Sequence, residues 1–107
     1  MRLLVTGSSG HLGEGLVREL RAAGHDVRGL DVLPSPTTDL VGSVADRALV
    51  REAMAGRDGV LHAATLHKPH VGSHAKADFV ETNVTGTLHL LEAVSYTHLT
   101  LPTNREV

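Results

Sequence analysis

The sequence predicts an α/β fold, a doubly wound parallel sheet in the order βαβαβα that is truncated before the sheet is complete. Two observations predict this fold. Short apolar runs alternate along the chain with amphipathic helical patterns, as parallel strands joined by crossover helices require. The first apolar run also leads directly into three glycines, Gly7, Gly10 and Gly13, at spacings of three. At 107 residues, the chain is one domain or part of one.

Two strands and the helix between them are predicted in the first third of the chain. Residues 3–5 are an apolar run suited to a buried parallel strand. Residues 11–23 follow a helical pattern, and Gly24 stands where that helix would be capped. Residues 26–30 form the second strand, which ends at Asp31. The expected buried face of the helix consists of Leu12, Leu16, Val17 and Leu20.

Two more strands and two more helices follow. After a proline-containing loop, residues 39–41 predict a short third strand. A helix over residues 46–54 would begin at an N-cap aspartate and stop at Gly56. Residues 58–64 predict a fourth strand, and a histidine-rich loop then leads to a long helix over residues 75–93.

The glycine turn indicates a dinucleotide site. Gly7 would make the tight turn after the strand, and Gly10 would let a pyrophosphate approach the backbone. Gly13 would let the following helix lie close to the strand, so that its N-terminus faces the phosphates. The alternative is a glycine-rich turn of an ordinary strand–helix unit, without a ligand.

Asp31 is the second indication, because it stands at the end of the second strand. A carboxylate at that place accepts hydrogen bonds from both hydroxyls of the adenosine ribose. It would also repel a 2′-phosphate, and no arginine immediately follows it, so NAD is favoured over NADP. The alternative is a solvated aspartate at a strand end.

Composition excludes several other functions. The formal net charge is −2, with acidic and basic residues interspersed, which argues against nucleic-acid or anionic-membrane partners. There are no cysteines, and therefore neither disulfides nor thiolate chemistry. The chain starts with a strand rather than a signal peptide, and no apolar run approaches the length of a membrane span. We therefore expect a cytoplasmic protein.

Four sequence motifs together resemble a known family. They are Thr6-Gly7-x-x-Gly10-x-x-Gly13, Asp31, His62-Ala63-Ala64 and Asn83-Val84-Thr85-Gly86-Thr87. In combination they resemble the N-terminal part of an extended short-chain dehydrogenase/reductase, and more narrowly the NAD-dependent epimerase/dehydratase family. The resemblance extends from residue 1 to about residue 93.

This resemblance implies a partial Rossmann fold with bound NAD. The implied activity is hydride transfer at a carbinol carbon of a small-molecule substrate, often a nucleotide sugar, in an oxidoreductase or isomerase; a homodimeric parent is a further expectation. Two positions depart from the family pattern. His11 stands where the family often has an aromatic residue, and Ser43 stands where it commonly has an aspartate that contacts the adenine amino group.

The expected cofactor contacts come from the turn, the strand ends and the last helix. The Ala63–Ala64 segment would pass the nicotinamide ribose, with close packing as the alternative. Asn83 would be mostly structural, with a contact to NAD, and Gly86 would allow close packing of the helix. The full expected set is Gly7, Ser9, Gly10, His11, Leu12, Gly13, Asp31, Ser43, Val44, Ala63, Ala64, Thr65, His67 and Asn83.

The histidine-rich loop does not predict a metal site. Pro69 and Gly72 disfavour a helix around His70 and His74, so the four-residue spacing of these histidines loses its meaning. A loop that lines the substrate pocket is favoured, with His67 near the cofactor or substrate. Solvated loop residues are the alternative.

The catalytic pair of the family is absent from this sequence. The family uses a tyrosine with a lysine four residues later, but Thr100 holds that position after Tyr96, the one tyrosine of the chain. We therefore expect residues 1–93 to be the NAD-binding half of a parent enzyme and to be inactive alone. The alternative is a non-catalytic NAD(P)-binding redox sensor or regulator of the same fold.

The tail over residues 94–107 looks foreign to the family. The apolar helical pattern stops, and the sequence resembles a translated sequencing adapter joined to a gene fragment. The alternative is a divergent strand over residues 96–101, whose β propensity is adequate.

Overall fold

A single parallel sheet forms the centre of the molecule. The computed structural model describes residues 1–64, 77 and 80–97. In this part of the chain the four strands are β1 (Arg2–Thr6), β2 (Asp26–Asp31), β3 (Leu40–Val41) and β4 (Gly59–His62). Their order across the sheet is β3-β2-β1-β4, and all three pairings are parallel. The predicted fold class is confirmed.

The parallel register brings the carboxyl ends of the strands to one edge of the sheet. Thr6 at the end of β1 lies opposite Leu30 of β2 on one side and His62 of β4 on the other. The same edge carries the turn after β1 and the loop after β2, which places Asp31 beside the glycines. This is the edge at which open α/β sheets bind ligands.

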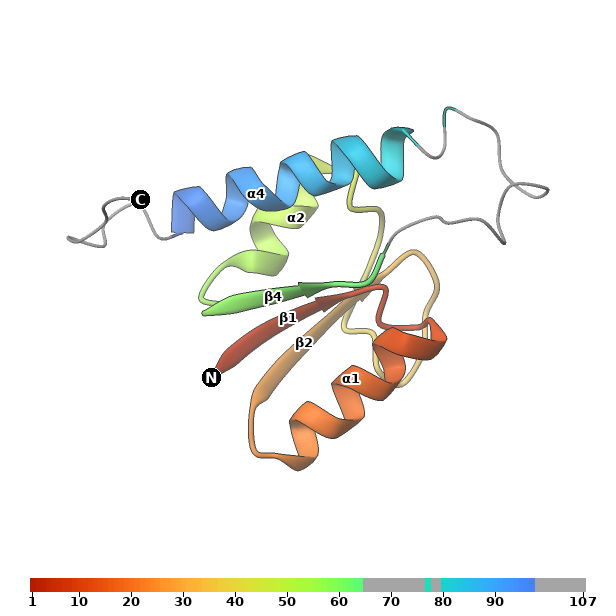
Figure 1. Ribbon diagram of the computed structural model, residues 1–107, viewed down its shortest axis with the longest axis vertical. Helices are drawn as coiled ribbons and strands as arrows, with labels where there is room; N and C mark the ends of the chain where they lie inside the picture. The colour runs from red at the N-terminus through yellow and green to blue at the C-terminus, as the bar shows by residue number, and fades with distance from the viewer. Residues whose placement is uncertain (65–76, 78–79, 98–107) are drawn as a thin grey trace.

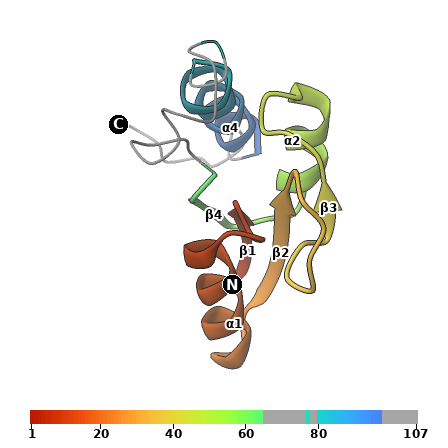
Figure 2. The same ribbon diagram turned by 90° about the vertical axis from the view of Figure 1, so that its right-hand side faces the viewer.

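Helices cover both faces of the sheet, because alternate side chains of the buried strands point to opposite sides. Helix α1 (His11–Ala22) lies on one face, while α2 (Arg47–Met54) and α4 (Gly86–Thr97) lie together on the other (Figures 1 and 2). The smaller core, under α1, contains Val5, Val17 and Val27. The larger core, under α2 and α4, contains Leu4, Leu30, Val44, Val50, Ala53, Met54, Leu90 and Ala93.

Most predicted boundaries of the helices and strands are confirmed. Gly24 follows α1 with a φ of 93°, and Asp46 caps α2 by accepting a hydrogen bond from the Leu49 amide at 3.2 Å. Leu12 was expected on the buried face of α1, but it is 65% exposed. It belongs to the first turn of the helix, which lies at the edge of the sheet and has no strand beneath it. Strand β4 stops at His62 because its partner β1 turns away at Gly7.

The last helix differs from the expectation at both ends. A π-helical segment, η2 (Val80–Thr85), precedes α4, and α4 continues to Thr97 rather than ending at residue 93. The predicted helix end is therefore wrong, and residues 96 and 97 are helical rather than extended. Residues 98–107, which hold the rest of the tail, lie outside the described residues. Gly86 was expected to allow close packing of the helix on the sheet, but the residue that a Cβ there would meet is Val44, in the loop after β3.

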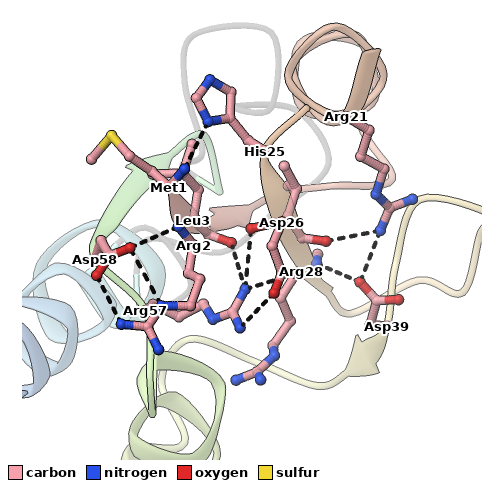
Figure 3. Close-up of polar contacts among 12 residues, drawn as sticks. Met1, Arg2, Leu3, Arg21, His25, Asp26, Arg28, Asp39, Arg57 and Asp58 are labelled. Carbon is pink, nitrogen blue, oxygen red and sulfur yellow. Dashed lines mark hydrogen bonds and ion pairs between the residues drawn. The ribbon is translucent and has the colours of Figure 1, made fainter. Parts of the chain in front are cut away.

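Ion pairs hold the opposite, N-terminal edge of the sheet (Figure 3). The Arg57 guanidinium, whose side chain is 8% exposed, bonds to the Asp26 carboxylate and to the Asp26 carbonyl at 3.2 Å. Arg2 pairs with Asp58 at 3.2 Å in the same region. Hydrogen bonds and charge from Arg57 hold the pKa of Asp26 below its ordinary value, and bonds from Arg2 do the same for the pKa of Asp58. Nearby, Arg28 donates to three carbonyls at the C-terminal end of α2.

Candidate cofactor-binding site

The glycine turn begins in a conformation that only glycine adopts easily. Gly7 has a φ of 72°, and its amide donates to the Leu30 carbonyl at 2.8 Å. A Cβ at this position would lie 2.8 Å from the Ala63 carbonyl carbon and 2.8 Å from the Ala64 nitrogen. The expected tight turn is confirmed, and its rear wall is the Ala63–Ala64 segment that follows β4.

Gly13 lets α1 lie against this turn. A Cβ on Gly13 would collide with the Gly7 carbonyl group, 2.6 Å from its carbon, and would lie 3.0 Å from the Ser8 Cα. Gly10 closes the turn by donating its amide to the Gly7 carbonyl at 3.0 Å. The close approach of helix and turn predicted for Gly13 is therefore confirmed, while the predicted role of Gly10 beside a pyrophosphate stays a prediction.

The N-terminus of α1 faces the site without a side-chain cap. Its N-cap is Gly10, which has no side chain to accept from the first amides of the helix. The first backbone bond of the helix runs from the Glu14 amide to the Gly10 carbonyl at 2.8 Å, so the amides of residues 11–13 remain available. Glu14 adds no net charge there, because it pairs with Arg18 at 2.8 Å. Such an end suits an anion.

Asp31 is held beside the turn rather than left in solvent. One carboxylate oxygen accepts the Ser9 amide at 2.9 Å, and the other accepts the Leu33 amide at 3.0 Å. Each oxygen keeps a lone pair for a second donor. The half-buried carboxylate is thus fixed at the mouth of the turn with accepting capacity toward a diol.

A cluster of hydroxyl groups, not expected from the sequence, ties the loop after β2 to the glycine turn. The Ser9 hydroxyl donates to the Leu33 carbonyl at 2.6 Å, and the buried Thr37 hydroxyl donates to the Ser8 carbonyl at 2.7 Å. Ser8 and Thr38 hydroxyls also lie 2.5 Å apart. The only sequence signal for this packing is the excess of Ser and Thr in two loops. The Ser9 hydroxyl therefore holds the turn to the loop after β2, and it is already hydrogen-bonded within the protein.

The loop after β3 holds Ser43 and Val44, the expected adenine side. The Ser43 hydroxyl accepts the Ala45 amide at 3.0 Å and still has its own proton to donate. Val44 is 4% exposed, so its side chain belongs to the core. Its carbonyl accepts from His89 Nδ1 at 3.1 Å, which ties the loop to α4. His89 of α4 is a positioning residue of this loop that the sequence did not reveal.

The remaining expected residues belong to three places: the end of β4, the segment η2 and the start of α1. The Ala63 amide donates to the Thr6 carbonyl at 3.2 Å, and the Ala64 amide donates to the Thr6 hydroxyl at 3.2 Å. Asn83 lies in η2, and its carbonyl accepts the Thr87 hydroxyl at 2.7 Å. His11 and Leu12 are exposed beside the turn. The expected residues Thr65 and His67, and with them His70 and His74, lie outside the described residues.

Two kinds of feature are absent from the part of the chain that the structure describes. Within residues 1–64, 77 and 80–97, no group of His, Cys, Asp or Glu side chains is arranged to hold a metal ion. None of the helices described there has both the length and the apolar character that crossing a membrane requires.

A strand, a close-packed glycine turn, an open helix N-terminus and an acid on the next strand define the first half of a Rossmann-type dinucleotide-binding domain. The particular family is the NAD dependent epimerase/dehydratase family, which the sequence matches over residues 3–101, and the chain belongs to it.

Named relatives agree with this assignment. A 3-beta-hydroxysteroid dehydrogenase of Mycolicibacterium neoaurum is 35% identical over 86% of this chain and 28% of its own length. A dTDP-glucose 4,6-dehydratase of Streptomyces niveus is 38% identical over 89% of this chain and 34% of its own. A short-chain dehydrogenase/reductase superfamily protein from Agrobacterium tumefaciens, solved with NAD, superposes with a TM-score of 0.78 at 36% identity, over 91% of this chain and 30% of that one. The chain thus spans about a third of the length of these relatives.

Proposed function

We propose that this chain binds NAD through the glycine turn, the N-terminus of α1 and Asp31, as the adenosine-and-pyrophosphate half of a larger oxidoreductase, epimerase or dehydratase. The observation that carries the proposal is the uncapped N-terminus of α1, held against the turn because Gly13 has no side chain. The amides of residues 11–13 would hold the pyrophosphate, and Asp31 would accept the ribose hydroxyls.

The same geometry supports NAD over NADP. A 2′-phosphate on the ribose would stand against the Asp31 carboxylate, whose oxygens already orient toward the turn through Ser9 and Leu33. Val32 and Leu33 follow Asp31, are exposed, and offer no positive charge to a phosphate. Repulsion between the phosphate and the Asp31 carboxylate would outweigh any hydrogen bond to the neutral hydroxyls nearby.

Bound NAD would supply a hydride acceptor for oxidation of a carbinol carbon. The described residues bind and orient the adenosine half, while the base for the substrate hydroxyl is expected in the rest of the parent protein. A nucleotide sugar is the proposed substrate class, in line with the dTDP-glucose 4,6-dehydratase among the relatives. A non-catalytic regulator remains the rival proposal, and a Tyr-x-x-x-Lys pair in the gene's continuation after residue 93 would decide for the enzyme.

Titration calorimetry of the purified chain with NAD and with NADP tests the binding proposal. Asp31→Asn keeps an acceptor for the Ser9 amide but removes the charge, and it should weaken NAD binding by about 1.5–3 kcal/mol. Asp58→Asn is the matched control at the opposite edge of the sheet, and it should leave affinity for NAD unchanged. Equal affinity of the unmodified chain for NAD and NADP, or equal losses in the two variants, would contradict the proposal.

A further inference from the structure

A chain of hydrogen bonds crosses the sheet edge directly behind the glycine turn. His62 is the last residue of β4. Its Nδ1 lies 2.6 Å from the Thr6 hydroxyl oxygen, and its Nε2 lies 3.2 Å from the Thr87 hydroxyl oxygen. Thr6 is fully buried, and His62 and Thr87 are half-buried. The chain therefore links β1, β4 and α4 at a place that belongs to none of the expected cofactor contacts.

The available protons give this chain of bonds a single direction. The Thr87 hydroxyl donates to the Asn83 carbonyl at 2.7 Å, so toward His62 it acts as an acceptor, and Nε2 carries the ring proton. Nδ1 of the neutral ring is then an acceptor, which the Thr6 hydroxyl satisfies. The Thr6 oxygen in turn accepts the Ala64 amide at 3.2 Å. Every member is satisfied only when His62 is neutral and protonated on Nε2.

This arrangement fixes the wall against which the turn is built. The backbone of Ala63 and Ala64 leaves no room for a Cβ on Gly7, and the Thr6 side chain holds that backbone through the Ala64 amide. At the other end of the chain of bonds, Thr87 and Asn83 belong to the helical segment that packs over the sheet. A change at His62 would therefore affect both the position of the Ala63–Ala64 backbone and the contact with α4.

We propose that His62 is a positioning residue of the cofactor site, which as the neutral Nε2–H tautomer holds the Ala63–Ala64 wall in register with the glycine turn. The proposal rests on the proposed binding of NAD. Protonation of Nδ1 would reverse the bond to Thr6, leave the Thr6 hydroxyl proton without its acceptor, and loosen the wall. Cofactor affinity should therefore fall as the pH falls.

Burial lowers the pKa of His62 and so favours the neutral ring. Other ionisable side chains of the packed elements do not face it in the described part of the chain. On β1, Arg2 pairs with Asp58 at the far edge; on α4, His89 bonds to the Val44 carbonyl and Glu92 pairs with Arg47. His11 also lies beside the turn, but it is the same in all the variants. The pH dependence of NAD affinity in each variant is therefore compared with that of the unmodified chain.

Nitrogen NMR of the histidine rings tests the tautomer without any cofactor. The His62 ring should show an unprotonated Nδ1 and a protonated Nε2 at neutral pH, and Thr6→Val should change the Nδ1 signal while Thr6→Ser restores it. A ring protonated on Nδ1, or one averaging freely between tautomers, would overturn the proposal whether or not NAD binds.

NAD titrations between about pH 5 and pH 8 test the effect on the site. In the unmodified chain, affinity should fall about three- to tenfold in total as the pH drops through the pKa of His62, because protonation costs the bond to Thr6. His62→Asn should lose this part of the profile, whereas His25→Asn, a histidine change at the opposite edge, should retain it. Thr6→Val should weaken NAD binding about three- to tenfold at pH 8, with Thr6→Ser close to the unmodified chain.

The outcomes separate the two proposals. If NAD binds and the pH profile of His62→Asn matches that of the unmodified chain, the positioning role is wrong while NAD binding stands. If the unmodified chain does not bind NAD, the proposed function fails and the positioning role fails with it, although the ring signals still report the hydrogen-bond chain. Circular dichroism of each variant shows whether it is folded, and if His62→Asn is not, Thr6→Val compared with Thr6→Ser tests the same hydrogen bond from its other end.

Discussion

Two glycines of α1 make a matched pair, because only one of them touches the glycine turn. A Cβ at Gly13 would collide with the backbone of Gly7 and Ser8, whereas a Cβ at Gly15 would meet nothing within 4 Å. Gly15→Ala should stabilise the chain by about 0.8–1 kcal/mol through helix propensity alone. Gly13→Ala gains the same helix propensity, but its methyl group would overlap backbone atoms, which cannot move aside as a flexible side chain can. This overlap costs up to about 3 kcal/mol. We expect Gly13→Ala to be about 2 kcal/mol less stable than the unmodified chain.

Urea unfolding followed by far-ultraviolet circular dichroism measures both free energies of unfolding. The steric cost at Gly13 is the difference between the two variants, about 3 kcal/mol, because their propensity gains cancel. NAD titration adds a second measurement: Gly13→Ala should weaken binding by displacing α1, and Gly15→Ala should not. Two alanine variants of equal stability and equal affinity would show that α1 does not lie on the turn as described.

Four other expectations concern stability, solubility and activity. Arg57→Met should cost about 2–3 kcal/mol in urea unfolding, because it removes the donor to the Leu3 and Asp26 carbonyls and the ion pair with Asp26; an unchanged midpoint would contradict this. The arginine partners of Asp26 and Asp58 lower the pKa values of these two carboxyl groups, so both carboxylates stabilise the fold above about pH 4. The midpoint temperature of thermal unfolding should therefore fall as the pH drops through these lowered pKa values. Because β4 is an outer strand of the sheet among the described residues, the purified chain should self-associate as its concentration rises; a chain that stays monomeric at high concentration in ultracentrifugation would refute this. Assays of NADH formation with alcohols and nucleotide sugars should show no turnover, since a tyrosine is a poor base at neutral pH without a nearby cation and no lysine stands four residues after Tyr96; any substrate turned over would show that another base serves.

Local patterns predicted the strand–turn–helix unit and the place of Asp31, because each depends on residues close together in the chain. A strand that is followed by glycines and an amphipathic helix predicts a tight turn with the helix packed back against the strand. The acid at the end of the next strand reaches the same edge of the sheet because the two strands pair in parallel. The close backbone contacts at Gly7 and Gly13 result from that spacing of the glycines.

Contacts across long sequence separations could not be predicted in this way. The bond between Thr6 and His62 joins positions 56 apart and depends on the register of β1 against β4. A polar residue at the last position of each apolar strand was the available signal, but it does not state the pairing. The contact of His89 with Val44 depends likewise on how α4 crosses the β3–α2 connection.

The boundaries that were wrong reflect tertiary context rather than local preference. Leu12 fits the apolar face of α1, yet the sheet does not extend beneath the first turn, and so the side chain is 65% exposed. The helix end expected at residue 93 rested on a change of composition, whereas α4 continues to Thr97. Asn83 lies in a π-helical segment, which propensities for α-helix do not distinguish.

The central position of β1 has a consequence for how the chain folds during synthesis. Of the four described strands β1 is made before the others, and one of its two partners, β4, is made 56 residues later. At ribosomal rates of about 5–20 residues per second, β1 emerges roughly 3–11 s before β4 can pair with it. During that interval the glycine turn has no wall behind it, because Ala63 and Ala64 do not yet exist. On the proposed binding of NAD, the turn therefore acquires the backbone that stands behind Gly7 only after β4 has joined the sheet.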